Sequence, residues 1–331
     1  MLVRLAPPLF VLLWSSAFIA AKIGLQHLSP LLFVAIRLSG SAIVLVALML
    51  VLRRSWRPLA RWRWLHCAIA GALLNAVGLM PPHVGLMIAP AAQIALVQSL
   101  TPLLTALCGM LVLNERLHAG QWLGLSLGVA GVGLVVGEAA LESPTRFEGL
   151  VLAFLGVMGL VTGTLYFGRF CRPVPLLQAA TAQFVSAAIV AALGAWWLET
   201  PRAEWTGPTI AAVGWSIFMV SLGGMGLYFA MLGRGTAART TANFYLVPGT
   251  VAVIGWLLLG ERLSWLAVIG LVAASAGCWL VSAATSPLKS NPESAGRATW
   301  FPLPRPIRRL LGTSTRRVAP RKLTLDKPFE D

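Results

Sequence analysis

The chain has 331 residues, of which 57% are hydrophobic and only 11% are charged, whereas soluble proteins carry about 25% charged residues. A soluble protein of this length could not bury so much apolar surface, so the composition excludes a soluble fold and predicts that lipid surrounds most of the chain.

The apolar segments predict an all-α integral membrane protein with ten transmembrane helices, because about 20 apolar residues cross a bilayer core as a helix. The expected spans are 9–25, 31–52, 65–88, 91–113, 121–138, 149–168, 176–198, 208–232, 240–259 and 263–283. Arg4 precedes the first span, as in a signal peptide, but no polar mature domain follows it. We therefore interpret the first span as a retained helix.

Basic residues gather in every second loop. Arg53 to Arg63 follow the second span, Arg169 and Arg172 the sixth, and Arg234 and Arg239 the eighth. Because basic loops stay in the cytoplasm, both termini are expected there. Residues 285–331 are polar, rich in Pro and basic. We expect a disordered cytoplasmic tail near anionic lipid headgroups, and no nucleic-acid partner.

A shift of 146 residues aligns the two halves of the chain. It superposes Glu115-Arg116-Leu117 on Glu261-Arg262-Leu263, Pro102 on Pro248, Gly109 on Gly255, Gly124 on Gly270, Gly131 on Gly277 and Arg37 on Gln183. Each half has five spans, an odd number, so the second half must enter the membrane in the opposite sense. The sequence thus predicts two inverted five-helix repeats, as in many secondary transporters.

The repeat sets the expected domain boundaries: a first repeat at 1–140, a second at 141–284 and the basic tail at 285–331. Each Glu-Arg pair falls in the short turn after the fourth span of its half. We expect it to form an ion pair at the helix end, with direct substrate contact as the alternative.

Three stretches resemble a known family. LLWSSAFIAAKIGL in the first span, ALVQSLTPLLTALCGMLVLNERL and ANFYLVPGTVAVIGWLLLGERL are similar to the EamA repeat of the drug/metabolite transporter superfamily, over about 9–283. This resemblance implies a ten-helix exporter of small metabolites such as amino acids in the bacterial inner membrane. It also implies a central cavity lined by the first, third, fourth, sixth, eighth and ninth spans. Pro81-Pro82-His83 departs from the family pattern, and paired prolines are expected to kink the third span and reshape that cavity.

No catalytic constellation is present. The eleven acidic residues fall in loops or in the tail, and the four His are scattered. We therefore expect no enzyme activity, metal site or cofactor, and keep a membrane-embedded enzyme as an alternative. Export of cationic drugs generally needs an acid within the membrane, so a multidrug-type exporter is the less favoured transporter. A neutral or zwitterionic substrate fits the sequence better than a cationic drug. We expect that a monomer can carry out the transport.

Two cations and several glycines lie within the spans. Lys22 is expected to reach the interface by snorkelling, whereas Arg37 has either a structural role or binds a carboxylate. GLSLG at 124–128 and GLVVG at 133–137 have the spacing of small residues that lets helices pack closely.

Polar residues predict two gates and a site between them. His83 with Gln98 would form the outer gate, and Tyr228 with Asn243 and Tyr245 the inner one, unless the tyrosines belong to the cytoplasmic aromatic belt. Trp14, Ser15 and Ser16 would orient a small polar substrate near the midplane. Together with Arg37, these nine residues are the predicted substrate-binding set.

Overall fold

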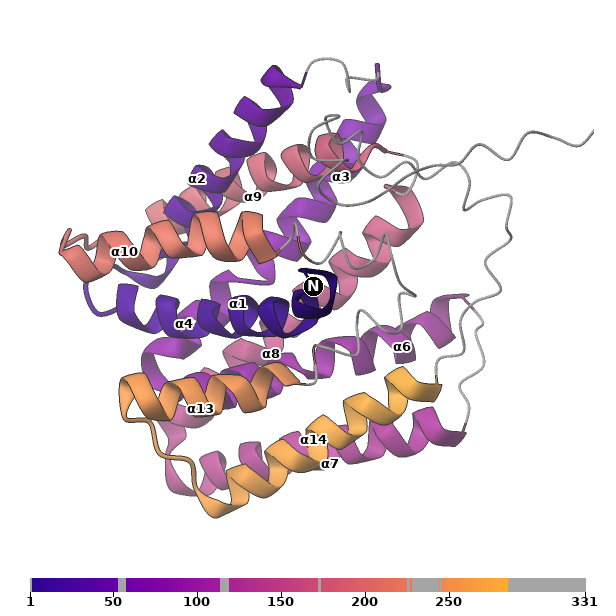
Figure 1. The fold of residues 1–331 in the computed structure, drawn as a ribbon, viewed down its shortest axis with the longest axis vertical. Coiled ribbons are helices and arrows are strands. Elements are labelled where there is room, and N and C mark those ends of the chain that lie inside the picture. Colours follow the sequence, from indigo (N-terminus) through magenta and orange to yellow (C-terminus); the bar gives the residue numbers. More distant parts are fainter. Residues whose placement is uncertain are drawn as a thin grey trace, which may run out of the picture. The chain divides into compact units, whose positions relative to one another are not determined.

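The computed structural model describes residues 2–52, 58–113, 119–171, 174–224, 227, 244 and 246–284. Within these ranges the regular structure is helical, apart from one isolated bridge between Leu28 and Ala203. The elements (Figure 1) are α1 (Leu2–Gly24), α2 (Pro30–Val51), α3 (Arg61–Gly71), η2 (Ala72–Val77), α4 (Met80–Ile88), α5 (Ala91–Gln98), α6 (Leu100–Leu113), α7 (Ala119–Glu142), α8 (Pro144–Phe170), α9 (Leu176–Leu198), α10 (Gly207–Trp215), η3 (Ser216–Gly224), α13 (Val247–Leu259) and α14 (Trp265–Ala284). The predicted tail lies outside the described residues.

The ten predicted spans are all represented by apolar helices. Seven helical segments are long and apolar enough to cross a membrane. Three shorter apolar helices, Ala91–Thr105, Val247–Leu259 and Trp265–Gly277, coincide with the fourth, ninth and tenth spans. Seven and three make ten, so the prediction of an all-α integral membrane protein is confirmed.

The third and eighth spans are interrupted at equivalent positions. In the third span α3 runs into the π-helix η2, and α4 then starts at Met80 with prolines in its first turn. A proline is tolerated there because the missing N–H would have no intrahelical acceptor. Pro81 and Pro82 thus begin a new helix instead of bending a continuous one. Shifted by 146 residues, η2 falls within the second π-helix, η3, and π-helical turns concentrate at functional sites.

Equivalent helices of the two halves run antiparallel. On α7 and α14, Gly131 approaches Gly270 while Gly124 approaches Gly277, so residue numbers rise on one helix as they fall on the other. Likewise the Glu199 carboxylate, at the end of α9, accepts hydrogen bonds from Leu31 N (3.1 Å) and Leu32 N (2.7 Å) at the start of α2. Antiparallel equivalents are what an inverted repeat requires.

Only one of the two glycine motifs packs helices. A Cβ on Gly277 of α14 would overlap backbone atoms of Gly124 and Gly128, the two glycines of GLSLG, and a Cβ on Gly128 would overlap Leu103. A Cβ on Gly133 or Gly137 would meet nothing within 4 Å. The expectation for GLVVG was therefore wrong, because its glycines lie on the outward face of α7.

The first helix of each half packs into the other half. α1 contacts α10, η3 and α13, and it lies between α10 and α13 in Figure 1. α8 correspondingly contacts α3, η2, α4, α5 and α6. This exchange brings the polar residues of α1 to the interface between the halves.

Candidate substrate site

Arg37 is a buried cation that has no anionic partner among the described residues. It lies seven residues after the start of α2 and only 8% of it is exposed. Its Nε donates a hydrogen bond to Ser221 Oγ on η3 at 3.2 Å, and no carboxylate pairs with it in the part of the chain that the structure describes. A guanidinium has five N–H groups, so four remain for another acceptor. The arrangement suits the binding of an anionic group.

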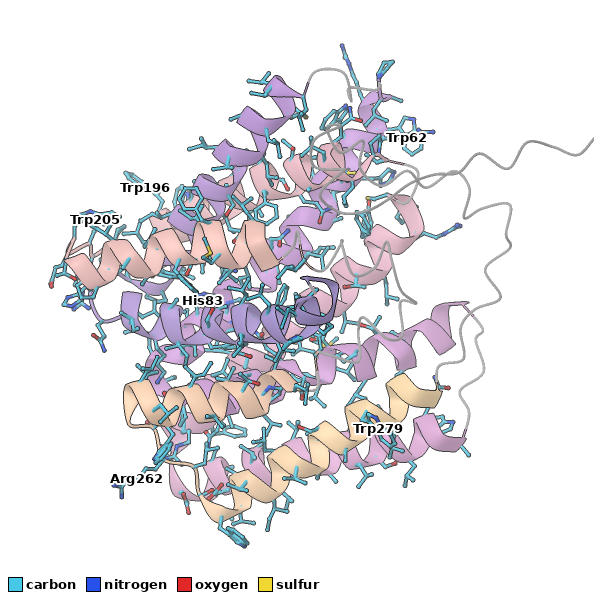
Figure 2. The ribbon with its side chains drawn as sticks, viewed as in Figure 1. Trp62, His83, Trp196, Trp205, Arg262 and Trp279 are labelled. Atoms are coloured by element: carbon cyan, nitrogen blue, oxygen red, sulfur yellow. The ribbon has the colours of Figure 1, made fainter. Side chains whose placement is uncertain are left out.

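His83 on α4 lies beside the same helix. Its ring stacks on Phe33, one turn before Arg37, with 5.8 Å between the ring centroids. Nδ1 donates to the Leu79 carbonyl oxygen at 2.7 Å, which leaves Nε2 of the neutral ring as an acceptor. Nε2 is buried and has no hydrogen-bond partner among the described residues. Figure 2 shows His83 among the helices rather than at their ends.

The α1 residues of the predicted site hold helices together. Ser15 Oγ donates to the Val247 carbonyl oxygen of α13 at 3.3 Å, and Ser16 Oγ accepts a hydrogen bond from Trp215 Nε1 of α10 at 2.8 Å. Trp14 stands edge-on to Phe244, with 5.3 Å between the ring centroids. The hydroxyls thus have partners within the protein, while Trp14 contributes an aromatic wall between the halves.

Neither of the two predicted gates is tested by the contacts of the described residues. Gln98 is half-buried at the end of α5, and its side chain makes no hydrogen bond within the described ranges. The contacts of His83 are with Phe33 and Leu79 instead of Gln98, so the outer gate stays a prediction. Tyr228, Asn243 and Tyr245 lie outside the described residues, and the inner gate is likewise untested.

Glu261 joins the two halves at one end of the helices. Gly260 adopts a left-handed conformation (φ 67°), which favours glycine and turns the chain after α13. Glu261 Oε1 lies 2.9 Å from Lys22 Nζ, and both carboxylate oxygens accept from Ala91 N, at 3.1 and 2.9 Å. We call these interactions the Glu261 contact. An ion pair is present here as expected, but the cation is Lys22 of the other half, and the exposed Arg262 points outward (Figure 2). The first copy, Glu115, lies outside the described residues.

Two loops meet at the same end, which we call the Glu261 end. His27 Nδ1 lies 3.1 Å from Glu204 Oε2, and Ser29 N donates to the Arg202 carbonyl oxygen at 3.0 Å. Glu204 N donates to the His27 carbonyl oxygen at 3.0 Å. The loops after the first and seventh spans are therefore bonded to each other. This end is closed by contacts between the halves.

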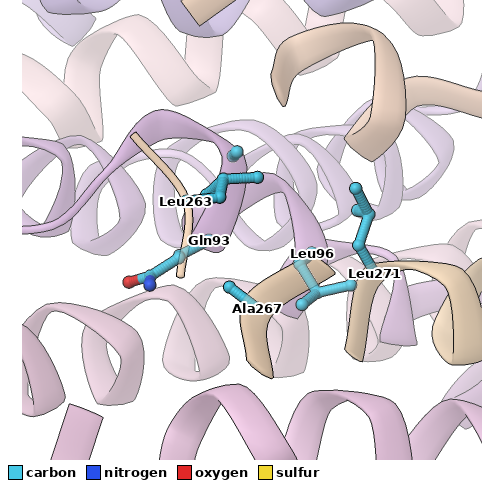
Figure 3. Close-up of a pocket in the computed structure, with 6 residues that line it drawn as sticks. Gln93, Leu96, Leu263, Ala267 and Leu271 are labelled. Atoms are coloured by element: carbon cyan, nitrogen blue, oxygen red, sulfur yellow. The ribbon is translucent and has the colours of Figure 1, made fainter. Parts of the chain in front are cut away.

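A shallow hollow lies next to the Glu261 contact (Figure 3). Its lining comes from α5, α14 and the loop between α13 and α14, with Ala92, Gln93, Leu96, Leu263, Ala267 and Leu271. It is too narrow to hold a water molecule. Gln93 is 4% exposed, and its Oε1 has no partner among the described residues. The hollow is thus a narrow seam at the closed end.

The fold and the site define a class of protein. Ten membrane segments in two inverted halves, with a buried cation at the interface, are the architecture of secondary transporters. A family model described as "EamA-like transporter family" matches residues 8–137 and again 147–283. The chain belongs to this family, and it is a multi-pass membrane transporter.

Relatives extend over most of the chain. The "Uncharacterized transporter YvbV" of Bacillus subtilis is 27% identical over 283 residues, covering 82% of this chain and 88% of that protein. The "Probable amino-acid metabolite efflux pump" of Salmonella typhimurium is 26% identical, covering 82% and 92%. One solved crystal structure shares the fold, with a TM-score of 0.59, 20% identity and coverage of 83% of this chain and 94% of that one.

Proposed function

We propose that the protein exports an amino acid or a related zwitterionic metabolite by alternating access, with the substrate carboxylate on Arg37. The observation that carries this proposal is the buried guanidinium, which has one neutral acceptor, while its other four N–H groups have no acceptor among the described residues. Placing a charge in a membrane costs about 2.5–3.5 kcal/mol or more, so it is usually retained for function. A substrate carboxylate would supply the missing counter-charge.

His83 supports a zwitterionic substrate. Its unpartnered Nε2 is an acceptor, so it can receive a hydrogen bond from the ammonium group of an amino acid. Trp14, Phe10 and Phe244 pack with ring centroids 5.1–5.4 Å apart and offer an apolar surface to the rest of the substrate. The printed name of the Salmonella relative, an amino-acid metabolite efflux pump, favours the same substrate class.

The loop charges support the orientation. Arg61 and Arg63 begin the third span, which ends at Ile88 beside the Glu261 contact. Arg169 is in the last turn of α8, whose start lies near the Glu138–Ser264 hydrogen bond at the Glu261 end. All three therefore lie toward the opposite end, and basic residues favour the cytoplasmic side. The Glu261 end would then face outward from the inner membrane, with both termini in the cytoplasm.

The test is flux of labelled amino acids in proteoliposomes. The panel contains free amino acids, their C-terminal amides, which lack the carboxylate, and their N-acetyl derivatives, which lack the ammonium. We expect the wild type to move only free amino acids. Arg37→Met should reduce that flux at least tenfold, because losing a charge-assisted hydrogen bond costs about 1.5–3 kcal/mol.

Arg262→Met is the matched control, since Arg262 is exposed, and it should transport like the wild type. If the amides were transported as fast as the free amino acids, the proposed binding of the substrate carboxylate by Arg37 would be refuted. Flux no greater than in empty vesicles across the whole panel would refute amino-acid export.

A further inference from the structure

The hydrogen bond between Arg37 and Ser221 has a counterpart in the repeat. A shift of 146 residues converts Arg37 on α2 into Gln183 on α9, and Asn75 on η2 into Ser221 on η3. The equivalent contact would therefore join Gln183 to Asn75. Both are buried or half-buried polar side chains within membrane spans, and neither belongs to the predicted site.

The two amides are placed to meet. Gly71 lies directly against the Gln183 backbone, and Ser186 Oγ donates to the Ala68 carbonyl oxygen at 2.7 Å. Asn75 follows Gly71 by one turn, and side chains lean toward the N-terminus of their own helix. Because α3 and α9 are antiparallel here, Asn75 leans toward Gln183, and Gln183 leans toward Asn75.

Only one of the two equivalent contacts is made. Arg37 is bonded to Ser221 at 3.2 Å, whereas the side chains of Asn75 and Gln183 make no hydrogen bond within the part of the chain that the structure describes. A hydrogen bond contributes a modest favourable free energy. Two facing amides that make no bond in this state can gain one in a second state.

The two contacts lie toward opposite ends of the helices. Arg37 lies seven residues from the start of α2, at the closed Glu261 end, and Gln183 lies seven residues from the start of α9, toward the opposite end. The contact that is made thus belongs to the closed end. The contact that is not made belongs to the other end.

We propose that the Asn75–Gln183 and Arg37–Ser221 contacts alternate during transport. In the state seen here Arg37 holds Ser221 and the Glu261 end is closed. In the opposite state Asn75 bonds to Gln183, Ser221 leaves Arg37, and the Glu261 end opens. Asn75 and Gln183 are then positioning residues, which stabilise the second state without touching the substrate. The inference rests on alternating access, which is part of the proposed function.

The experiment measures how often the Glu261 end opens. Gln93→Cys places a thiol in the seam at that end, where the native side chain is 4% exposed. The protein is held in lipid nanodiscs, and its labelling rate by a water-soluble maleimide is followed by mass spectrometry of the peptide that contains position 93. Ser221→Ala should raise the rate about fivefold, since losing one hydrogen bond changes a two-state population by about that factor.

Substitutions in the counterpart should act in the opposite direction. Asn75→Leu and Gln183→Leu should each lower the labelling rate about fivefold, because they remove the contact of the open state. Asn75→Ser keeps a hydroxyl at the position equivalent to Ser221 and should label close to the wild-type rate. Ser126→Leu, on the exposed face of α7, is the control and should change nothing.

The labelling experiment needs no substrate, so its outcomes test the alternation directly. If Asn75→Leu does not elute as a folded protein, Gln183→Leu and Asn75→Ser carry the test. Labelling that rises in Asn75→Leu or Gln183→Leu, or that stays unchanged in these two variants or in Ser221→Ala, would overturn the alternation. The amino-acid flux assay is independent, so failure of the proposed substrate class would be recognised separately.

Discussion

The two cations within the spans have opposite electrostatic environments. Lys22 pairs with Glu261 at 2.9 Å near the helix ends, where a partly exposed ion pair contributes about 0–1 kcal/mol. Arg37 is more deeply buried, and among the described residues its side chain bonds only to the Ser221 hydroxyl. A buried charge without a counter-charge is costly, and the proposed substrate carboxylate would supply that counter-charge.

The positions of both cations were visible in the sequence, since a charge stands out in an apolar run. Their partners were not. Ser221 and Glu261 lie 184 and 239 residues further along the chain, and both come from the other half of the molecule. Nor did the sequence indicate Phe33 or Trp215, because aromatic residues are common in spans and only the packing shows which of them meets a site residue. The 146-residue register could have pointed to Asn75 and Gln183, but only after the Arg37–Ser221 contact was known.

Substituting Glu261 tests the Glu261 contact. Glu261→Gln keeps an oxygen acceptor for Ala91 N but removes the charge that pairs with Lys22. We expect a loss of about 1 kcal/mol and a lower Tm in detergent, because Lys22 is left without its partner. Arg262→Gln, on the adjacent exposed residue, should have the Tm of the wild type. Equal Tm values for the two variants would contradict a stabilising role of the contact.

At the scale of elements, the spacing of glycines predicts close packing but not which face is covered. GLSLG and GLVVG are adjacent on α7, yet only the first faces α14. The π-helical turns are a second feature that the sequence predicts only in part. Pro81 and Pro82 mark the interruption of the third span, whereas no proline marks η3 in the eighth, and only the repeat register relates the two.

Glycines at the contact between α7 and α14, and glycines away from that contact, form a matched pair of tests. Gly131→Ala and Gly277→Ala should each destabilise the protein by about 1–3 kcal/mol, because the added methyl overlaps backbone of the facing helix. Gly133→Ala and Gly137→Ala add the same methyl to open space and should be neutral or slightly stabilising. Thermal unfolding of the four variants in one detergent gives the comparison. Similar Tm values for both pairs would show that α7 and α14 are not closely packed in the membrane.

At the scale of the whole molecule, the odd number of spans in each half was enough to predict inversion. The antiparallel pairing of α7 with α14 and of α2 with α9 agrees with it. What the sequence could not reveal is the exchange of α1 and α8 between the halves, since neither helix differs in composition from its neighbours. That exchange places Trp14, Ser15 and Ser16 at the interface between the halves, where the proposed alternating access would change their exposure.

The last prediction concerns the sides of the membrane. Positions 89, 143, 203 and 262 lie at the Glu261 end. The loops near 89 and 262 share the Glu261 contact, and the loop near 203 is bonded to the loop after the first span through Arg202 N and Ser29 Oγ. Glu138, just before 143, accepts a hydrogen bond from Ser264 at 2.7 Å. Topology reporters fused after 89, 143, 203 and 262 should therefore all report the outer side, and reporters after 60, 115, 172 and 236 should report the cytoplasm. Basic loops set the direction, so replacing Arg61 and Arg63 by Gln should weaken the preference of their loop for the cytoplasm. The reporters in the second half should still separate into the same two groups. Fusions after 89 and 262 that report opposite sides could not share one end of the helices, and both the inverted repeat and the Glu261 contact would then have to be abandoned.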